Sequence, residues 1–202
     1  MTTTVTGEVH SLWGTPVLMR QVPAEDGYAA RLRDIILRKQ HDPGGTMIGV
    51  VDGDKTRSDL LQWSEPEIDP LREWILDGAE AMNAHVNAGV ASNGQQIPMI
   101  AEAWGVIYQE WGFHYLHNHH DSGWSGVLYV ETGNITPGSG CIEFLDPRPG
   151  AGPTQPAENI LHNVAPQPGL MLMFPSWLQH WVTPYLGDSV RICVAFNIGF
   201  ER

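Results

Sequence analysis

Residues 114–130 read HYLHNHHDSGWSGVLYV, and this segment is the most informative part of the sequence for both the fold and the chemistry. Four of the nine histidines lie between positions 114 and 120, just before an apolar run rich in residues that favour β-strands. Side chains at i and i+2 on a strand face the same side, so His117, His119 and Asp121 are expected to share one face. Either His117 with His119, or His119 with Asp121, could form half of a metal site, and the spacing does not choose between them.

The third ligand must come from elsewhere, and His180 is the best candidate. It follows the apolar strand GLMLMF and the turn at Pro175 and Ser176. Arg191 comes eleven positions later, inside the apolar segment DSVRICVAFNIGF. A cation there loses hydration unless an anion pairs with it. A distant carboxylate side chain could supply that anion, but the order of metal pair, histidine and arginine favours a bound dicarboxylate.

The rest of the chain predicts a mainly β protein with N-terminal helices, of the α+β class. After Gln96, short apolar runs alternate with Gly/Pro turns and give seven or so strands. Upstream, a strand is expected over residues 10–22, and helices over 24–40 and about 70–90. We therefore expect one domain over 1–202, with helical support at about 24–91. A double-stranded β-helix core, the jelly-roll of cupins, fits about 97–200.

Composition and net charge limit the classes of molecule that the protein is expected to bind. The 202 residues include 11 Lys and Arg against 23 Asp and Glu, for a net charge of −12, which disfavours nucleic acid and anionic membranes. A small molecule or peptide is the expected substrate, and a homodimer is compatible with the sequence. The chain has no 18-residue apolar run and no basic, apolar leader at its start. Cys141 and Cys193 form no CxxC pair, so a cytoplasmic location is expected.

The same residues resemble a small subfamily of the iron(II)/2-oxoglutarate-dependent oxygenases. The similarity runs through LWGTPVLMRQV, Trp104, Gly112 and GCIEFLDPR. It is most specific in HNHHDSGWSGVLYV and in PGLMLMFPSWLQHWVTPYLGDSVRICVAFN. The resemblance implies a jelly-roll that binds Fe(II) through His117, His119 and His180, and 2-oxoglutarate through Arg191. It therefore favours the His117/His119 pair. Two departures are His120, where the subfamily usually has proline, and Cys193, where it often has serine.

An enzyme of this kind hydroxylates an unactivated C–H bond with O₂ and releases succinate and CO₂ as co-products. Ser125 or Tyr129, on the strand after the histidines, could add a hydrogen bond to the co-substrate. Two other functions remain open at this point. One is a three-histidine cupin-type dioxygenase or isomerase that does not use 2-oxoglutarate, and the other is a jelly-roll binding module without activity. The sequence does not identify the substrate, nor does it separate hydroxylation from desaturation.

Overall fold

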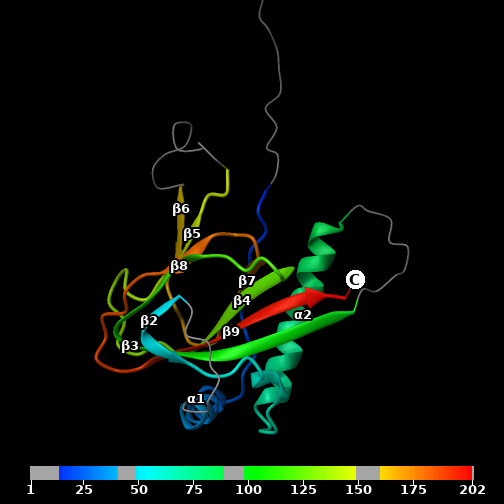
Figure 1. The fold of residues 1–202 in the computed structure, drawn as a ribbon. Helices are drawn as coiled ribbons and strands as arrows, with labels where there is room; N and C mark the ends of the chain where they lie inside the picture. The colour runs from blue at the N-terminus through cyan, green and yellow to red at the C-terminus, as the bar shows by residue number, and fades with distance from the viewer. Residues whose placement is uncertain (1–13, 41–48, 89–97, 149–159, 202) are drawn as a thin grey trace, which may run out of the picture.

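The computed structural model of the chain describes residues 14–40, 49–88, 98–148 and 160–201 (Figure 1). Two α-helices and a 3-10 helix support the sheet in this part of the chain: α1 (Tyr28–Lys39), η1 (Leu60–Gln62) and α2 (Ile68–Val86). The strands are β1 (Leu18–Gln21), β2 (Val50–Lys55), β3 (Met99–His117), β4 (Trp124–Glu131), β5 (Ile142–Leu145), β6 (Leu161–Val164), β7 (Leu170–Pro175), β8 (His180–Val182) and β9 (Arg191–Phe200). Neither α-helix has the apolar length that a bilayer crossing requires, as far as the described residues go.

Both predicted helices are confirmed, with shifted ends. Helix α1 begins at Tyr28 instead of residue 24, because the preceding residues form a turn that ends at Gly27 with a φ of 78°. Such a left-handed conformation is costly for residues other than glycine. Helix α2 begins two residues earlier than expected, at Ile68, and its predicted last residues lie outside the described part of the chain.

The seven strands from β3 to β9 agree with the number expected after Gln96. The sheet runs in the order β1-β7-β4-β9-β3-β8-β5-β6, with β2 paired to β3 off this path. Strand β3 pairs with β9 over Met99–Tyr108 and with β8 at His114 and His117. Since one strand belongs to both halves of the sheet, the sheet curls on itself (Figure 1). The resulting arrangement is the predicted double-stranded β-helix.

Two clusters of apolar residues hold this architecture together. One joins α1, α2 and η1 to the outer face of β3, β4, β7 and β9, and it contains the buried positions Leu32, Ile36, Leu71 and Ile75. The other fills the space inside the curled sheet, between residues such as Phe144 and Phe174. The helices therefore brace the outer face of the sheet, and its inner face is left to line a cavity.

Strand β2 was not predicted from the sequence. Its segment, VVDGDK, mixes apolar and charged residues and is half-buried along most of its length. The pairing with β3 shifts register between Val51 and Gly53, where Asp52 takes a φ of 46°. A bulge of this kind interrupts the two-residue alternation by which a strand is recognised.

Candidate active site

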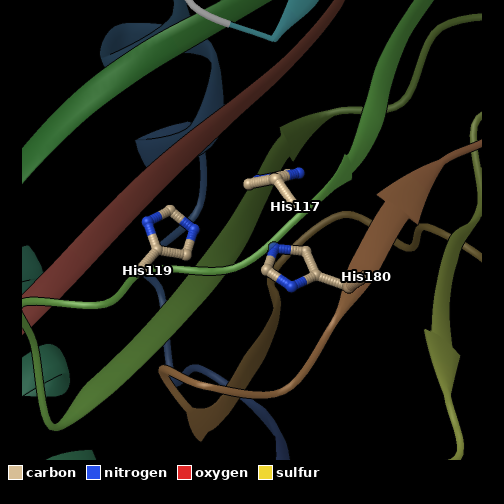
Figure 2. Close-up of side chains that lie close together, drawn as sticks. All are labelled: His117, His119 and His180. Atoms are coloured by element: carbon tan, nitrogen blue, oxygen red, sulfur yellow. The ribbon is translucent and has the colours of Figure 1, made fainter.

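Three histidines converge inside the curled sheet. His117 is the last residue of β3, His119 follows two residues later, and His180 opens β8. Their rings lie close together (Figure 2), and one nitrogen from each lies within 4.8 Å of the others. The ring centroids are 4.3 Å apart for His117 and His180, and 5.2 Å and 5.5 Å from His119 to those two rings. Three imidazoles this close together can hold one transition-metal ion.

Backbone carbonyls fix the direction of two of the rings. His117 Nδ1 lies 2.7 Å from the Tyr115 oxygen, and His180 Nδ1 lies 2.8 Å from the Leu178 oxygen. A carbonyl oxygen only accepts hydrogen bonds, so each Nδ1 carries the hydrogen in the neutral ring. The Nε2 lone pair is then free to bind a metal, which is how metal-binding histidines are usually held.

The surroundings also keep these histidines neutral. Burial lowers the pKa of His180 to about 3, with a further contribution from His117. Burial likewise lowers the pKa of His119 to about 4, helped by His117 and Lys55, and it lowers the pKa of His117. Because a metal binds the neutral imidazole, protons compete weakly with a metal for this site.

The structure places His119 differently from the sequence-based prediction. His117 and His119 were expected side by side on one strand, but β3 ends at His117 and His119 lies beyond it. The His119 backbone N–H donates to the Ser176 oxygen at 2.8 Å, so the segment before β8 positions it. Asp121 is exposed and does not join the cluster of potential ligands among the described residues.

A cavity of about 420 Å³ adjoins the histidines, and Arg191 lies at its buried end. The Arg191 side chain is only 1% exposed and stacks over the rings of Tyr108 and Tyr129, at 4.6 Å and 5.3 Å from their centroids. Arg191 Nε and Nη1 and the Tyr129 hydroxyl are buried without a hydrogen-bond partner, and no carboxylate of the described residues pairs with this guanidinium. A buried cation beside donors without an acceptor favours the binding of an anion at this end of the cavity.

Two neighbours complete the surroundings of Arg191. Gly140 has a φ of 62°, and a side chain there would come within 3.1 Å of Arg191 Nε, so this glycine gives the guanidinium its space. Cys193 lines the cavity two residues beyond Arg191, and burial raises the pKa of its thiol, which keeps it neutral.

The hydroxyls of Tyr129 and Ser125, the two candidates for a hydrogen bond to the co-substrate, lie in different places. Tyr129 lines the cavity and adjoins Arg191. Ser125 pairs with Asn197, which lies six residues from Arg191 along β9, and its hydroxyl donates to Asn197 Oδ1 at 2.8 Å. Only Tyr129 has an unpartnered hydroxyl beside the guanidinium.

His114 supports the site from behind the cluster. Its Nδ1 lies 2.6 Å from the Tyr108 hydroxyl, and its ring centroid lies 5.3 Å from that of His117. Burial lowers the pKa of His114 to about 2, with smaller contributions from Lys55 and His117. The neutral His114 ring therefore shares one hydrogen bond with the Tyr108 hydroxyl, which fixes a tyrosine ring that also stacks on Arg191.

Sequence reasoning missed two charged residues of the cavity, Lys55 and Glu102. Lys55 lies on the unpredicted strand β2. Glu102 shares one face of β3 with Trp104, and period-two alternation through AEAWGVIY would have grouped these two residues. Among the aromatic residues near the histidines in sequence, Trp104 and Tyr108 line the cavity, and Trp111 and Trp177 are exposed.

Comparison with known families agrees with this geometry. Residues 102–197, which run from β3 into β9, match the family described as "Putative 2OG-Fe(II) oxygenase". No curated protein sequence matches the chain.

Solved structures share the fold at low sequence identity. A prolyl-4-hydroxylase from Pseudomonas putida is 16% identical, with a TM-score of 0.61 over 93% of each chain. HygX from Streptomyces hygroscopicus, solved with nickel, 2-oxoglutarate and hygromycin B, is 15% identical, with a TM-score of 0.60 over 92% of this chain and 83% of that one. The epimerase SnoN from nogalamycin biosynthesis is 14% identical, with a TM-score of 0.59 over 92% and 78%. Residues 102–197 therefore match a 2OG-Fe(II) oxygenase family, and the chain shares the fold of these solved structures.

Proposed function

We propose that this oxygenase oxidises a C–H bond of a small molecule or a peptide side chain, by hydroxylation. His117, His119 and His180 would bind Fe(II), and Arg191 would bind the far carboxylate of 2-oxoglutarate. The observation that carries the proposal is the buried Arg191 guanidinium, whose Nε and Nη1 lack partners in the cavity that the three histidines also line. A dicarboxylate that reaches from the histidines to Arg191 would satisfy both ends of this space.

Each residue has a separate task in this proposal. His117, His119 and His180 would hold the metal through neutral ring nitrogens. Arg191 offers parallel N–H donors to a carboxylate, and Tyr129 adds a third donor beside it. Tyr108 is held by its hydrogen bond to His114, and its ring in turn holds the Arg191 guanidinium in place. Apolar neighbours such as Phe174 and Val182 exclude water from this end of the cavity.

When bound, Fe(II) and 2-oxoglutarate supply the O₂-dependent oxidative decarboxylation that yields succinate and CO₂ together with the oxidised substrate. The protein contributes binding, orientation and the exclusion of water. Since all three proposed ligands are neutral, the metal keeps its full positive charge. We therefore expect Fe(II) to bind more tightly when the anionic co-substrate is present.

The rival function is a three-histidine metal enzyme that does not use 2-oxoglutarate. In that case Arg191 would serve the fold alone. The family match favours the 2-oxoglutarate reaction, and the unpartnered guanidinium favours it independently. The reaction outcome is less constrained, because structures with the same fold include both a prolyl-4-hydroxylase and an epimerase.

Anaerobic titration of the protein with Fe(II) and 2-oxoglutarate tests the proposal. The wild-type protein should develop the weak visible charge-transfer band of the metal–keto-acid chelate. His180→Ala should give no band, and His162→Ala, an exposed histidine on β6, should behave like the wild type. Equal Fe(II) affinity with and without 2-oxoglutarate, and no band, would contradict the proposal.

A further inference from the structure

A hydrogen-bonded row of polar side chains crosses three strands at the end of the cavity opposite Arg191. Glu102 on β3 pairs with Asn197 on β9, and Asn197 pairs with Ser125 on β4. Ser125 Oγ donates to Asn197 Oδ1 at 2.8 Å, and Asn197 Nδ2 donates to Glu102 Oε1 at 3.0 Å. Both ends of the Asn197 amide are engaged, so the row fixes the Glu102 carboxylate from behind.

Glu102 presents the rest of its carboxylate to the cavity. It lines the cavity together with Trp104, which lies two residues further along the same face of β3. Glu102 is exposed, Trp104 is half-buried, and Glu102 Oε2 has no hydrogen bond or ion pair within the described residues. A carboxylate beside the face or edge of an indole ring is a suitable environment for an organic cation.

The register of the sheet separates the charges of the cavity along its length. Arg191 pairs with Tyr108, and Lys55 pairs with Val106 one row closer to the opening. Glu102 pairs with Asn197, six residues beyond Arg191 on β9, which corresponds to roughly 20 Å at about 3.3 Å per residue. The cations therefore lie toward the buried end, and the carboxylate lies at the open end.

The histidine cluster lies between these two ends. The ring centroid of His119 is 6.5 Å from that of Trp104, whose row lies next to the row of Glu102. A molecule held by Trp104 and Glu102 would thus lie on the side of the histidines away from Arg191. Arg191 and the co-substrate occupy the opposite side in the proposed function.

We infer that Glu102 and Trp104 bind a positively charged group of the substrate, an amine or a guanidine, and thereby place a neighbouring C–H bond beside the histidine cluster. This inference rests on the proposed function, because it assigns the substrate of that same site. Asn197 and Ser125 act as positioning residues for the carboxylate. The net charge of −12 further attracts cations to the protein.

The test compares ligands of matched shape that differ by one positive charge. Isothermal titration calorimetry of the metal-free protein would use n-hexylamine against 1-hexanol, and L-arginine against L-citrulline. The charged member of each pair should bind about tenfold more tightly to the wild type. In Glu102→Gln this preference should fall below about twofold. Glu80→Gln, which removes the same charge from the exposed face of α2, should keep the wild-type preference.

Three results would overturn the inference: equal binding within each pair, an undiminished preference in Glu102→Gln, or no binding of either cation at millimolar concentration. The anaerobic chelate band is recorded on the same proteins. A missing band with an intact cation preference would contradict the proposed function and leave the cation site standing. A normal band without any cation preference would contradict the cation site alone.

Discussion

The two ends of the cavity carry opposite charges in opposite environments. Arg191 is 1% exposed and lies over two tyrosine rings, and no carboxylate of the described residues pairs with it. Glu102 is exposed and is held through a single hydrogen bond from Asn197. Charge interactions are strong away from water and weak when screened by it. The buried end, where we propose that 2-oxoglutarate binds, should therefore respond to substitution much more strongly than the open end.

The largest effect is expected for the histidines between the two ends. His180→Ala removes one of the three proposed metal ligands, so bound iron and succinate formation should each fall by at least about a hundredfold. Metal analysis after dialysis and a coupled assay for succinate would measure the two quantities.

Asp121→Ala is the matched variant for this prediction. Asp121 is exposed and outside the cluster, so its loss should leave iron binding as in the wild type. If Asp121→Ala lost the metal and His117→Ala kept it, the ligand set would instead be His119, Asp121 and His180.

The next effect concerns the buried end alone. Arg191→Met should raise the dissociation constant for 2-oxoglutarate by at least about a hundredfold, because a charge-assisted pair in a buried site is lost. Without 2-oxoglutarate, the melting temperature should stay the same or rise, since a buried cation without a partner costs stability. Calorimetry and thermal unfolding would measure these changes.

Glu102→Gln provides the comparison for the other end. It should change the dissociation constant for 2-oxoglutarate by less than about threefold. A large drop in the melting temperature of Arg191→Met, with unchanged 2-oxoglutarate binding, would make the guanidinium a structural group and remove the contrast between the ends.

A smaller effect separates the two hydroxyls of β4. Tyr129→Phe removes a donor beside Arg191, so 2-oxoglutarate should bind about tenfold more weakly. Ser125→Ala should change that affinity by less than about twofold, but it should lower the free energy of unfolding by about 1 kcal/mol, because Asn197 Oδ1 loses its donor. Calorimetry and urea unfolding would show which hydroxyl serves which end. The reverse order of effects would place Ser125 on the co-substrate.

Sequence alone located the buried end of the cavity better than the open end. Arg191 and His180 stand out because an apolar strand rarely contains a cation or leads into a buried histidine without a reason. A polar residue in an apolar segment is unusual, and such a residue can be recognised from the sequence alone.

The open end lacks such a signal. Alternation places Glu102 and Trp104 on one face of their strand, but the curl of the sheet decides that this face is the inner one. Ser125 and Tyr129 share a face of β4, and only the register with β9 shows that Ser125 lies beside Asn197 and Tyr129 beside Cys193. Lys55 could not be predicted from the sequence, because the bulge at Asp52 interrupts the alternation by which β2 would be recognised. Alternation along one strand tells which residues share a face, but it does not tell which strand far away in the sequence lies beside them.

The smallest effect is the change in the pH dependence of stability that the loss of one buried histidine should cause. The pKa of His114 is lowered to about 2, that of His119 to about 4 and that of His180 to about 3, mainly by burial. In the unfolded chain these groups take up protons near about pH 6.5. The unfolded state therefore binds more protons below that pH, and the metal-free protein should lose stability as the pH falls from about 6.5 toward 4. Each such histidine should contribute about 1 kcal/mol between about pH 6.5 and 5.5, measured by urea unfolding.

His114→Gln keeps an acceptor for the Tyr108 hydroxyl but does not titrate, so its pH slope should be shallower by about one proton. A slope identical to that of the wild type would mean that His114 takes up its proton in the folded protein as readily as in the unfolded chain.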